Sequence, residues 1–422
     1  MVNSNMSSCI IKSWVNDMKR KYVKARHRII ETLVYPFIRL MIAFKYKYRF
    51  DRLKVTRKNP HIVVYNHLSG DDQFLVGFSI RGPIYYVATE DITSMGFLSK
   101  LLNYLVYIIP FKKSTNDVNA VRICLKVIKE GGTIIIAPEG NRSYDGTTCY
   151  IKPSIVKMIK KMKVPVVIYN LSGLYGALPR WADKSRRGEC EGRIKRILTY
   201  DEYKDLSNEE FYEIIANGLS HDETKIEGSY KSKHLAEYVE RVLYVCPKCG
   251  ITKFKSKKDI LRCTTCGLEA KYQEDMRFKN NYPFETIRDW YRYQEAFVNS
   301  LDLEKYDGKV MFDDDVTLLK VIPYKKKNKV YDKCLINCYN NRVEFIDKET
   351  SEAKSYDYKD ITAMSCLGKN KFNFYIDNDI YQIKGDERFN ALRYVNIYYH
   401  YRNVNNLCDV EDTYGNRKFL GL

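Results

Sequence analysis

Short apolar runs alternate with amphipathic stretches between residues 59 and 177. The apolar runs are rich in β-branched residues, which is typical of strands buried on both faces of a sheet. They lie at 61–65, 84–88, 105–111, 132–137 and 164–173. The stretch 118–132 has apolar residues at helical spacing and ends in glycine, as helices commonly do. Because predicted strands alternate with predicted helices, the pattern predicts an α/β domain core.

The pattern changes after residue 177. Residues 178–245 are rich in charge, and the stretches 207–219 and 233–245 have the spacing of helices. Between 306 and 403 the apolar positions follow a period of two, which predicts short strands, and 386–403 predicts a closing helix. The alternating positions are Leu335, Val343, Phe345, Phe372, Phe374, Ile376, Tyr381 and Ile383. This order resembles a pleckstrin-homology-like barrel over 316–403, and a plain β-sandwich is the alternative.

The N-terminal segment, residues 1–58, combines basic residues with one apolar stretch at 29–44. Its apolar positions recur at helical spacing and are Ile30, Leu33, Val34, Phe37, Met41 and Phe44. Glu31, Pro36 and Arg39 interrupt the stretch, which is shorter than the ~20 apolar residues of a membrane span. The pattern favours a basic amphipathic helix lying in a membrane surface. A helix packed on the domain, with its basic face in solvent, is the alternative.

Most of the positive charge lies in this same segment. The 422-residue chain has 71 Lys and Arg against 52 Asp and Glu, a formal charge of +19. Residues 1–60 contain 15 basic residues against 3 acidic ones, an excess of 12. Because this charge surrounds the apolar stretch, it favours an anionic membrane surface as a partner and argues against nucleic acid.

Composition and the placement of the cysteines also indicate the cellular compartment. With 45% hydrophobic and 29% charged residues, the chain is expected to form folded globular domains. No uninterrupted apolar core and no small-residue cleavage site follow the first basic residues, so we expect no signal peptide. The 12 cysteines fit a reducing compartment, since four form two Cys-x-x-Cys pairs and the others stand singly. We therefore expect a peripheral protein on the cytoplasmic face of the cell membrane.

A histidine and an aspartate follow the first predicted strand of the α/β core. Ser69 and Asp72 form a Ser-x-x-Asp pattern ahead of an apolar run, which predicts that Ser69 caps a helix and that the acids lie at its positive end. The cap leaves His67 unexplained. It lies just past the carboxyl end of a strand, where open α/β sheets bind their ligands. A helix start and a catalytic pair are both compatible with this stretch.

A second turn of the same kind follows the predicted strand 132–137. It contains Glu139, Gly140 and Arg142 within residues 138–143. Arginine binds phosphate through two parallel hydrogen bonds, and glycine lets a ligand approach the backbone closely. The turn suits an anionic ligand, and an exposed ion pair within a turn is the structural alternative.

Four blocks in this region together resemble the glycerolipid acyltransferase family, the 1-acylglycerol-3-phosphate acyltransferases. "NHLSGDD" resembles the family's Asn-His-x-Ser-x-x-Asp motif, and "APEGNRS" its Phe-Pro-Glu-Gly-Thr-Arg-Ser block. "IPFKK" and "VPVVIYNLSG" are similar to its two other blocks, and all four follow the family's order. The departures from the family's usual residues are Ala137, Asn141, Lys113, Ile168 and Pro153.

The resemblance implies a bacterial enzyme of phospholipid biosynthesis. It would transfer a fatty acyl group from acyl-CoA or acyl carrier protein to the free hydroxyl of a lysophospholipid, foremost 1-acylglycerol-3-phosphate, which gives phosphatidate. His67 would act as the general base and Asp72 would orient its ring, with no redox cofactor. The residues expected to bind the acceptor's glycerol phosphate are Glu139, Gly140, Arg142, Lys112 and Lys113.

Four cysteines form a compact module between 246 and 268. Cys246 and Cys249 are followed, after 13 residues, by Cys263 and Cys266, which is the spacing of a zinc ribbon. Four thiolates leave zinc no open position, so the metal would be structural. Two redox Cys-x-x-Cys motifs are the alternative.

These patterns predict a multidomain chain in which the acyltransferase α/β domain carries the chemistry. Another lysolipid acceptor, a zinc-ribbon nucleic-acid binder and an inactive lipid-binding adaptor are the alternative functions. The predicted segments are 1–58, a membrane-associating helix; 59–177, the acyltransferase core; 178–245, its helical extension; 246–268, the zinc ribbon; 269–305, a helical linker; 306–403, the β-rich domain that resembles a pleckstrin-homology domain; and 404–422, a tail.

Overall fold

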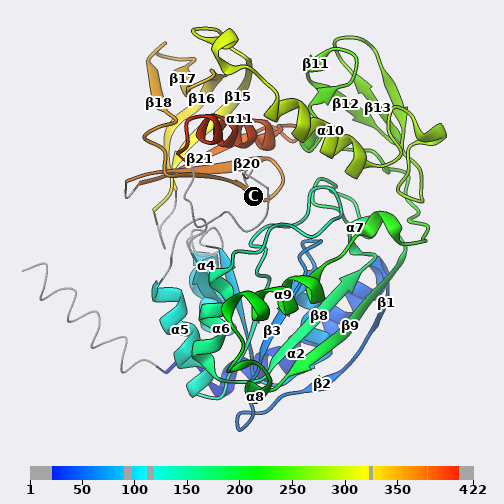
Figure 1. Ribbon diagram of the computed structural model, residues 1–422, viewed down its shortest axis with the longest axis vertical. Helices are drawn as coiled ribbons and strands as arrows, with labels where there is room; N and C mark the ends of the chain where they lie inside the picture. Colours follow the sequence, from blue (N-terminus) through cyan, green and yellow to red (C-terminus); the bar gives the residue numbers. More distant parts are fainter. Residues whose placement is uncertain (1–20, 90–96, 112–117, 323–326, 378, 408–422) are drawn as a thin grey trace, which may run out of the picture.

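The computed structural model describes residues 21–89, 97–111, 118–322, 327–377 and 379–407. Figure 1 shows a sheet flanked by helices in its lower half, a second sheet at the upper left and the cysteine module at the upper right. The first 20 residues of the predicted N-terminal segment and residues 408–422 of the predicted tail lie outside the described residues. The mixed α/β class with a β-rich C-terminal region, predicted from the sequence, is confirmed.

The first sheet has seven strands in the order β1-β9-β8-β3-β7-β5-β6. Neighbouring strands are parallel, except for β8 and β9, which are antiparallel. The strands are β1 (Lys47–Phe50), β9 (Glu189–Leu198), β8 (Val166–Ser172), β3 (Ile62–Tyr65), β7 (Thr133–Ile136), β5 (Ile84–Thr89) and β6 (Ile109–Phe111). All residues of β3 and β7 are buried, as their continuous apolar runs predict.

Helices cover both faces of this sheet. Side chains alternate along β3, so that Ile62 and Val64 join the core under α5, α6 and α9, whereas Val63 and Tyr65 join the core on the opposite face. The helices of this part are α2 (Ala25–Lys45), α3 (Asp72–Ser79), α4 (Phe97–Leu105), α5 (Val118–Lys129), α6 (Ser154–Met162), α7 (Leu174–Ala177), α8 (Tyr200–Tyr203) and α9 (Asn208–Leu219). Two short strands, β2 (Leu53–Lys54) and β4 (Ile80–Arg81), pair in parallel at its edge.

The predicted apolar helix at 29–44 forms as part of α2, but its apolar stripe faces solvent. Phe37 is 72% exposed and Phe44 is 75% exposed, whereas His27 and Glu31 are buried against the domain. Ile42 is buried as well, and Tyr35 and Ile38 pack against the core, so α2 lies on the domain while most of the predicted apolar stripe faces solvent. None of the helices within the described ranges is long and apolar enough to cross a membrane.

The prediction of a helical extension at 178–245 is only partly right. Helix α9 confirms the stretch 207–219, whereas β9 adds a strand, and the predicted helix at 233–245 is reduced to a short 3-10 turn, η3 (Val239–Arg241). The amide of Ala236 donates to Lys258 O, and the amide of Tyr238 donates to Ser256 Oγ, both over 2.7 Å. Tyr238 also has a positive φ of 71°. Contacts with the cysteine module thus replace helical hydrogen bonds, which the apolar spacing alone could not predict.

The cysteine module consists of short antiparallel strands, and a helix follows it in the chain. The strands are β10 (Val245–Cys246), β11 (Gly250–Ile251), β12 (Phe254–Lys257), β13 (Ile260–Cys263) and β14 (Glu269–Lys271), and the helix is α10 (Ile287–Asn299). Further 3-10 turns are η2 (Glu223–Lys225), η4 (Lys279–Asn281) and η5 (Leu303–Tyr306).

The C-terminal region forms a second seven-stranded sheet, antiparallel throughout, in the order β18-β17-β16-β15-β21-β20-β19. Its strands are β15 (Phe312–Lys320), β16 (Asn328–Cys338), β17 (Arg342–Asp347), β18 (Ala353–Asp357), β19 (Ala363–Leu367), β20 (Lys371–Ile376) and β21 (Asp379–Gly385). Helix α11 (Ala391–Val404) packs against β19 and β20, and Figure 1 shows it beside β20. The period-two strands and the closing helix predicted for this region are confirmed.

One continuous core joins the three parts of the chain. It runs from Val63 of the first sheet through Leu261 of the cysteine module and Trp290 of α10 to Ile383 of the second sheet. The buried Asn390 also donates from Nδ2 to Glu240 O over 2.9 Å, which links the C-terminal region to the segment before the cysteines. The second sheet is therefore packed against the acyltransferase-like part and is not a loosely tethered appendage.

Candidate active site

The carboxyl end of β3 is fixed by the residue before His67. Asn66 donates from Nδ2 to Leu171 O over 2.8 Å and accepts the amide of Leu171 at Oδ1 over 2.6 Å. Leu171 belongs to β8, so the pair ties the loop after β3 to the neighbouring strand. The backbone that carries His67 is therefore held by a buried residue at the edge where parallel sheets bind ligands.

His67 and Asp72 meet directly. His67 Nδ1 lies 2.8 Å from Asp72 Oδ2, and the two side chains are 21% and 0% exposed. Asp72 also accepts the amides of Leu68 and Ser69 over 2.7 and 3.0 Å. Burial raises the pKa of Asp72, while the hydrogen bond from His67 opposes the shift. The five-residue spacing thus produces an imidazole oriented by a buried carboxyl group.

The predicted capping role of Ser69 is largely wrong. Helix α3 begins at Asp72, and its N-cap residue Asp71 makes no side-chain cap hydrogen bond. Ser69 Oγ accepts only the Asp71 amide at 3.4 Å, whereas Asp72 accepts the amide of Ser69. Asp71 instead binds Lys45 over 2.9 Å and the Tyr46 hydroxyl over 2.7 Å. Only one half of the capping-box pattern forms, in which the Asp72 carboxyl accepts the Ser69 amide.

The second turn is hydrogen-bonded to the first. Glu139 Oε1 accepts the His67 amide over 2.8 Å, and Oε2 accepts the Cys149 amide over 2.7 Å. The Ser143 amide donates to His67 O over 2.9 Å. Burial raises the pKa of Glu139 to about 8, against the effect of the two amides. Glu139 therefore holds the backbone around His67, and its predicted contact with the acceptor phosphate stays a prediction.

Gly140 and Arg142 lie in the same turn. Gly140 has a φ of 67°, and no atom lies within 4 Å of where its Cβ would be, so the left-handed backbone is the feature that requires glycine. The Arg142 guanidinium lies beside the first turn, with Nη1 3.3 Å from the position of a Cβ on Gly70. The structure thus places Arg142 next to the His67 loop. Lys112 and Lys113 lie outside the described residues.

Sequence reasoning missed Arg180. This side chain is only 4% exposed, and its Nη1 donates to Arg142 O over 3.1 Å. It lies in the charged segment after the fourth block, where one arginine among many carries no local signal. Only the packing of this segment against the second turn reveals it.

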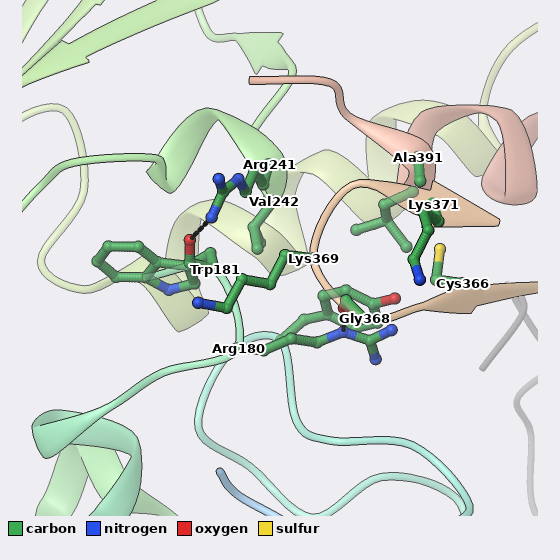
Figure 2. Close-up of a pocket in the computed structure, with 11 residues that line it drawn as sticks. Arg180, Trp181, Arg241, Val242, Cys366, Gly368, Lys369, Lys371 and Ala391 are labelled. Atoms are coloured by element: carbon green, nitrogen blue, oxygen red, sulfur yellow. Dashed lines mark hydrogen bonds between the residues drawn. The ribbon is translucent and has the colours of Figure 1, made fainter. Parts of the chain in front are cut away.

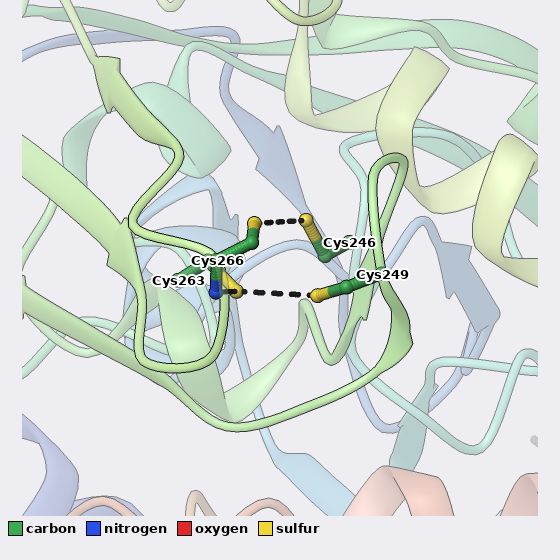
Figure 3. Close-up of side chains that lie close together, drawn as sticks. All are labelled: Cys246, Cys249, Cys263 and Cys266. Carbon is green, nitrogen blue, oxygen red and sulfur yellow. Dashed lines mark hydrogen bonds between the residues drawn. The ribbon is translucent and has the colours of Figure 1, made fainter.

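The four cysteines converge, as Figure 3 shows. Their sulfur atoms all lie within 4.8 Å of one another, with Cys246 and Cys266 separated by 3.5 Å and Cys249 and Cys263 by 3.6 Å. The Lys248 amide donates to Cys246 Sγ and the Cys266 amide donates to Cys263 Sγ. The donor set can hold a metal ion, and it lies apart from His67.

Comparison with known proteins agrees with the site geometry. Residues 48–171 match the family model described as Acyltransferase. The chain is 26% identical over 125 residues to the 1-acyl-sn-glycerol-3-phosphate acyltransferase of Borreliella burgdorferi. That match covers 29% of this chain and 50% of the relative, so the chain spans about half the length of the curated relative it matches.

Two solved structures resemble parts of the chain. The 1-acyl-sn-glycerophosphate acyltransferase PlsC of Thermotoga maritima is 20% identical with a TM-score of 0.40, over 49% of this chain and 84% of that one. The N-terminal PH domain of Vps36 is 14% identical with a TM-score of 0.20, over 23% of this chain and 82% of that one. The likeness to acyltransferases therefore rests on the match to the family model and to the curated relative. The part of the chain that contains His67, Asp72, Glu139 and Arg142, residues 48–171, is an acyltransferase domain.

Proposed function

We propose that the protein transfers a fatty acyl group from an acyl thioester, acyl-CoA or acyl carrier protein, to the free hydroxyl of 1-acylglycerol-3-phosphate. The observation that carries this proposal is the 2.8 Å contact between His67 Nδ1 and the fully buried Asp72, in a loop bonded to the Arg142 turn. A base next to a phosphate-binding arginine suits an acceptor with both a hydroxyl and a phosphate.

The proposed mechanism needs no covalent acyl-enzyme. His67 accepts the hydroxyl proton at Nε2 while the hydroxyl oxygen attacks the thioester carbonyl carbon. Asp72 holds the ring in the required tautomer and stabilises the imidazolium. When the tetrahedral intermediate collapses, the C–S bond breaks, the ester forms, and the leaving thiolate takes the proton from His67. Ser69 has no part as a nucleophile, because its side chain is buried and bonded to the Asp71 amide.

We also propose that the reaction takes place at a membrane surface. Helix α4, like α2, exposes large apolar side chains, and its Phe97 is 80% exposed. The two helices touch, since Arg26 stacks 3.8 Å from the Tyr104 ring. Apolar side chains beside a basic segment fit a lipid surface better than a nucleic acid.

The cysteine cluster is proposed to bind one structural zinc ion. Sulfur atoms bound to one zinc at ~2.3 Å lie about 3.8 Å apart in a tetrahedral site, close to the separations of 3.5 and 3.6 Å. Four thiolates would complete the coordination, so the ion would stabilise the fold around Trp290 and take no part in acyl transfer.

The decisive experiment incubates the purified full-length protein with labelled acyl-CoA or acyl carrier protein thioester and a panel of acceptors in mixed micelles. The panel contains lysophosphatidate, lysophosphatidylcholine, lysophosphatidylethanolamine and monoacylglycerol. We expect phosphatidate as the main product. Transfer mainly to a zwitterionic lysolipid would favour the alternative acceptor, and no transfer to any acceptor by folded protein would contradict the proposed function.

A further inference from the structure

A turn of the C-terminal sheet lies on the arginine of the second active-site turn. Gly368, between β19 and β20, accepts a hydrogen bond from Arg142 Nη2 over 3.3 Å and another from Arg180 Nε over 3.3 Å. Figure 2 shows Gly368 beside Arg180, with Lys369 next to it. Two guanidinium groups from the acyltransferase side thus converge on one carbonyl oxygen from a region 226 residues away from Arg142.

Asp71 and Asp72 only partly balance the charges of these two arginines. Within the described ranges, neither Arg142 nor Arg180 forms an ion pair with a carboxylate, whereas the nearby Arg241 binds Asp183 over 2.8 and 3.1 Å. Arg180 is 4% exposed and stacks 4.1 Å from the Tyr144 ring. Burial, and then the charge of Arg180, lowers the pKa of Arg142 to about 10. Arg180 is buried and Arg142 is partly buried, and two such cations that share a neutral oxygen are suited to an anion with several oxygens.

The β19–β20 turn fills the space beside the two arginines. The cavity next to Gly368 has a volume of about 10 Å³, which is room for no more than about one water molecule. Lys369 Nζ binds Asp183 over 2.7 Å, and Asn370 Nδ2 binds Asp386 O over 2.7 Å, so the turn is held from both sides. A phosphate group reaches both arginines only when the Gly368 carbonyl moves away.

We propose that Arg180 and Arg142 together form the binding site for the acceptor's phosphomonoester group, and that the Gly368 carbonyl holds the place of a phosphate oxygen until the acceptor binds. This inference rests on the proposed acyl transfer and deepens it, since it adds a binding residue outside the four blocks. It also gives the C-terminal sheet a part in the reaction. The acceptor displaces the β19–β20 turn, and the turn returns after the product leaves.

The first test compares Arg180→Gln and Arg180→Lys with the wild type. The loss of two charge-assisted hydrogen bonds should raise the KM for lysophosphatidate about 10- to 100-fold in Arg180→Gln, with an unchanged KM for the acyl donor. Arg180→Lys should recover part of the loss, because the charge remains. The same factor should appear in the Ki of glycerol 3-phosphate, a soluble competitor that carries the phosphate without the acyl chain.

Arg186→Gln is the matched control. Arg186 is also buried, but it donates to the carbonyls of Gly176 and Leu235, so its loss should lower the melting temperature without changing the Ki of glycerol 3-phosphate. An equal rise in the KM of donor and acceptor in Arg180→Gln, or an unchanged Ki, would overturn the assignment. Because wild-type activity is measured in the same series, this result is distinct from a failure of the proposed function.

The second test follows the turn itself. Hydrogen exchange of residues 366–371 is measured in the full-length protein with and without lysophosphatidate in mixed micelles, using lysophosphatidylcholine micelles as the control. Faster exchange in this turn only with lysophosphatidate is expected. Unchanged or slower exchange at saturating lysophosphatidate would show that the Gly368 carbonyl does not give way to the phosphate.

Discussion

At the scale of single residues, two buried acids near His67 have different tasks. Asp72 contacts the imidazole and two backbone amides, whereas Glu139 contacts the amides of His67 and Cys149 and the Cys149 thiol. Asp72 therefore sets the orientation of the ring, and Glu139 sets the position of the chain that carries it. A carboxyl group that accepts backbone amides is hard to replace, because each buried amide left without a hydrogen-bond partner costs about 1–3 kcal/mol of folding stability.

The His67→Ala variant should lower kcat by about 100-fold or more, because that is the usual contribution of a positioned general base. The melting temperature should change little, since the ring is partly exposed and its backbone amide and carbonyl keep their partners. Initial rates with lysophosphatidate and thermal melts of the same preparations measure both effects. A folded variant with the wild-type rate would rule out His67 as the base.

Asp72→Asn is the companion variant and should behave differently. Its activity should fall comparably, because the amide no longer fixes the ring tautomer. Its melting temperature should fall as well, since the side chain of Asp72 also accepts the amides of Leu68 and Ser69. A loss of rate in His67→Ala without a loss of stability, together with both losses in Asp72→Asn, separates the two roles.

At the scale of elements, α2 buries Ile42 together with two polar side chains and exposes most of its large apolar residues. It buries polar side chains, His27 and Glu31, and exposes large apolar ones such as Phe37 and Phe44. Burial raises the pKa of Glu31 to about 8 and lowers the pKa of His27 to about 4, so both groups favour their neutral forms at this interface. An apolar face left in water is unfavourable, and a lipid surface would remove that cost.

The double variant Phe37→Glu, Phe44→Glu should bind anionic vesicles at least about tenfold more weakly, since burying one such side chain contributes about 1.5–3 kcal/mol. Flotation with phosphatidylglycerol vesicles, at low and high salt, measures the change. Val404→Glu, at an exposed apolar position on α11, is the control and should bind as the wild type does. Equal binding by the double variant would exclude α2 as the membrane contact.

At the scale of the whole molecule, the cysteine module connects the two sheets. Phe254 and Leu261 of the module share one core with Trp290 of α10 and with Phe389 at the start of the C-terminal helix region. Arg241, just before the module, donates to Trp181 O over 2.7 Å on the acyltransferase side and to Glu387 O over 2.6 Å on the other. Loss of structure in the module should therefore spread to the position of the β19–β20 turn.

Replacing all four of Cys246, Cys249, Cys263 and Cys266 by serine should remove bound zinc and lower the melting temperature, because a site of this kind contributes on the order of 10 kcal/mol to folding. Appreciable activity should remain, since the metal is not needed for the chemistry. Metal content, melting and initial rate are measured together, with Cys190→Ser as the control at a buried single cysteine. A complete loss of rate at the wild-type melting temperature would instead make the metal a participant in catalysis.

Local patterns were enough to predict the strand before His67, the pairing of His67 with Asp72 and the convergence of the four cysteines. Each of these depends on residues close in sequence, or on a ligand set with a fixed spacing. Two features depend on the surface against which a segment packs: which face of α2 is buried, and the loss of the predicted helix at 233–245. A periodic pattern of apolar residues does not contain that information. The contact of Arg142 and Arg180 with Gly368 joins residues up to 226 positions apart, and only the packing of the second sheet against the first decides it.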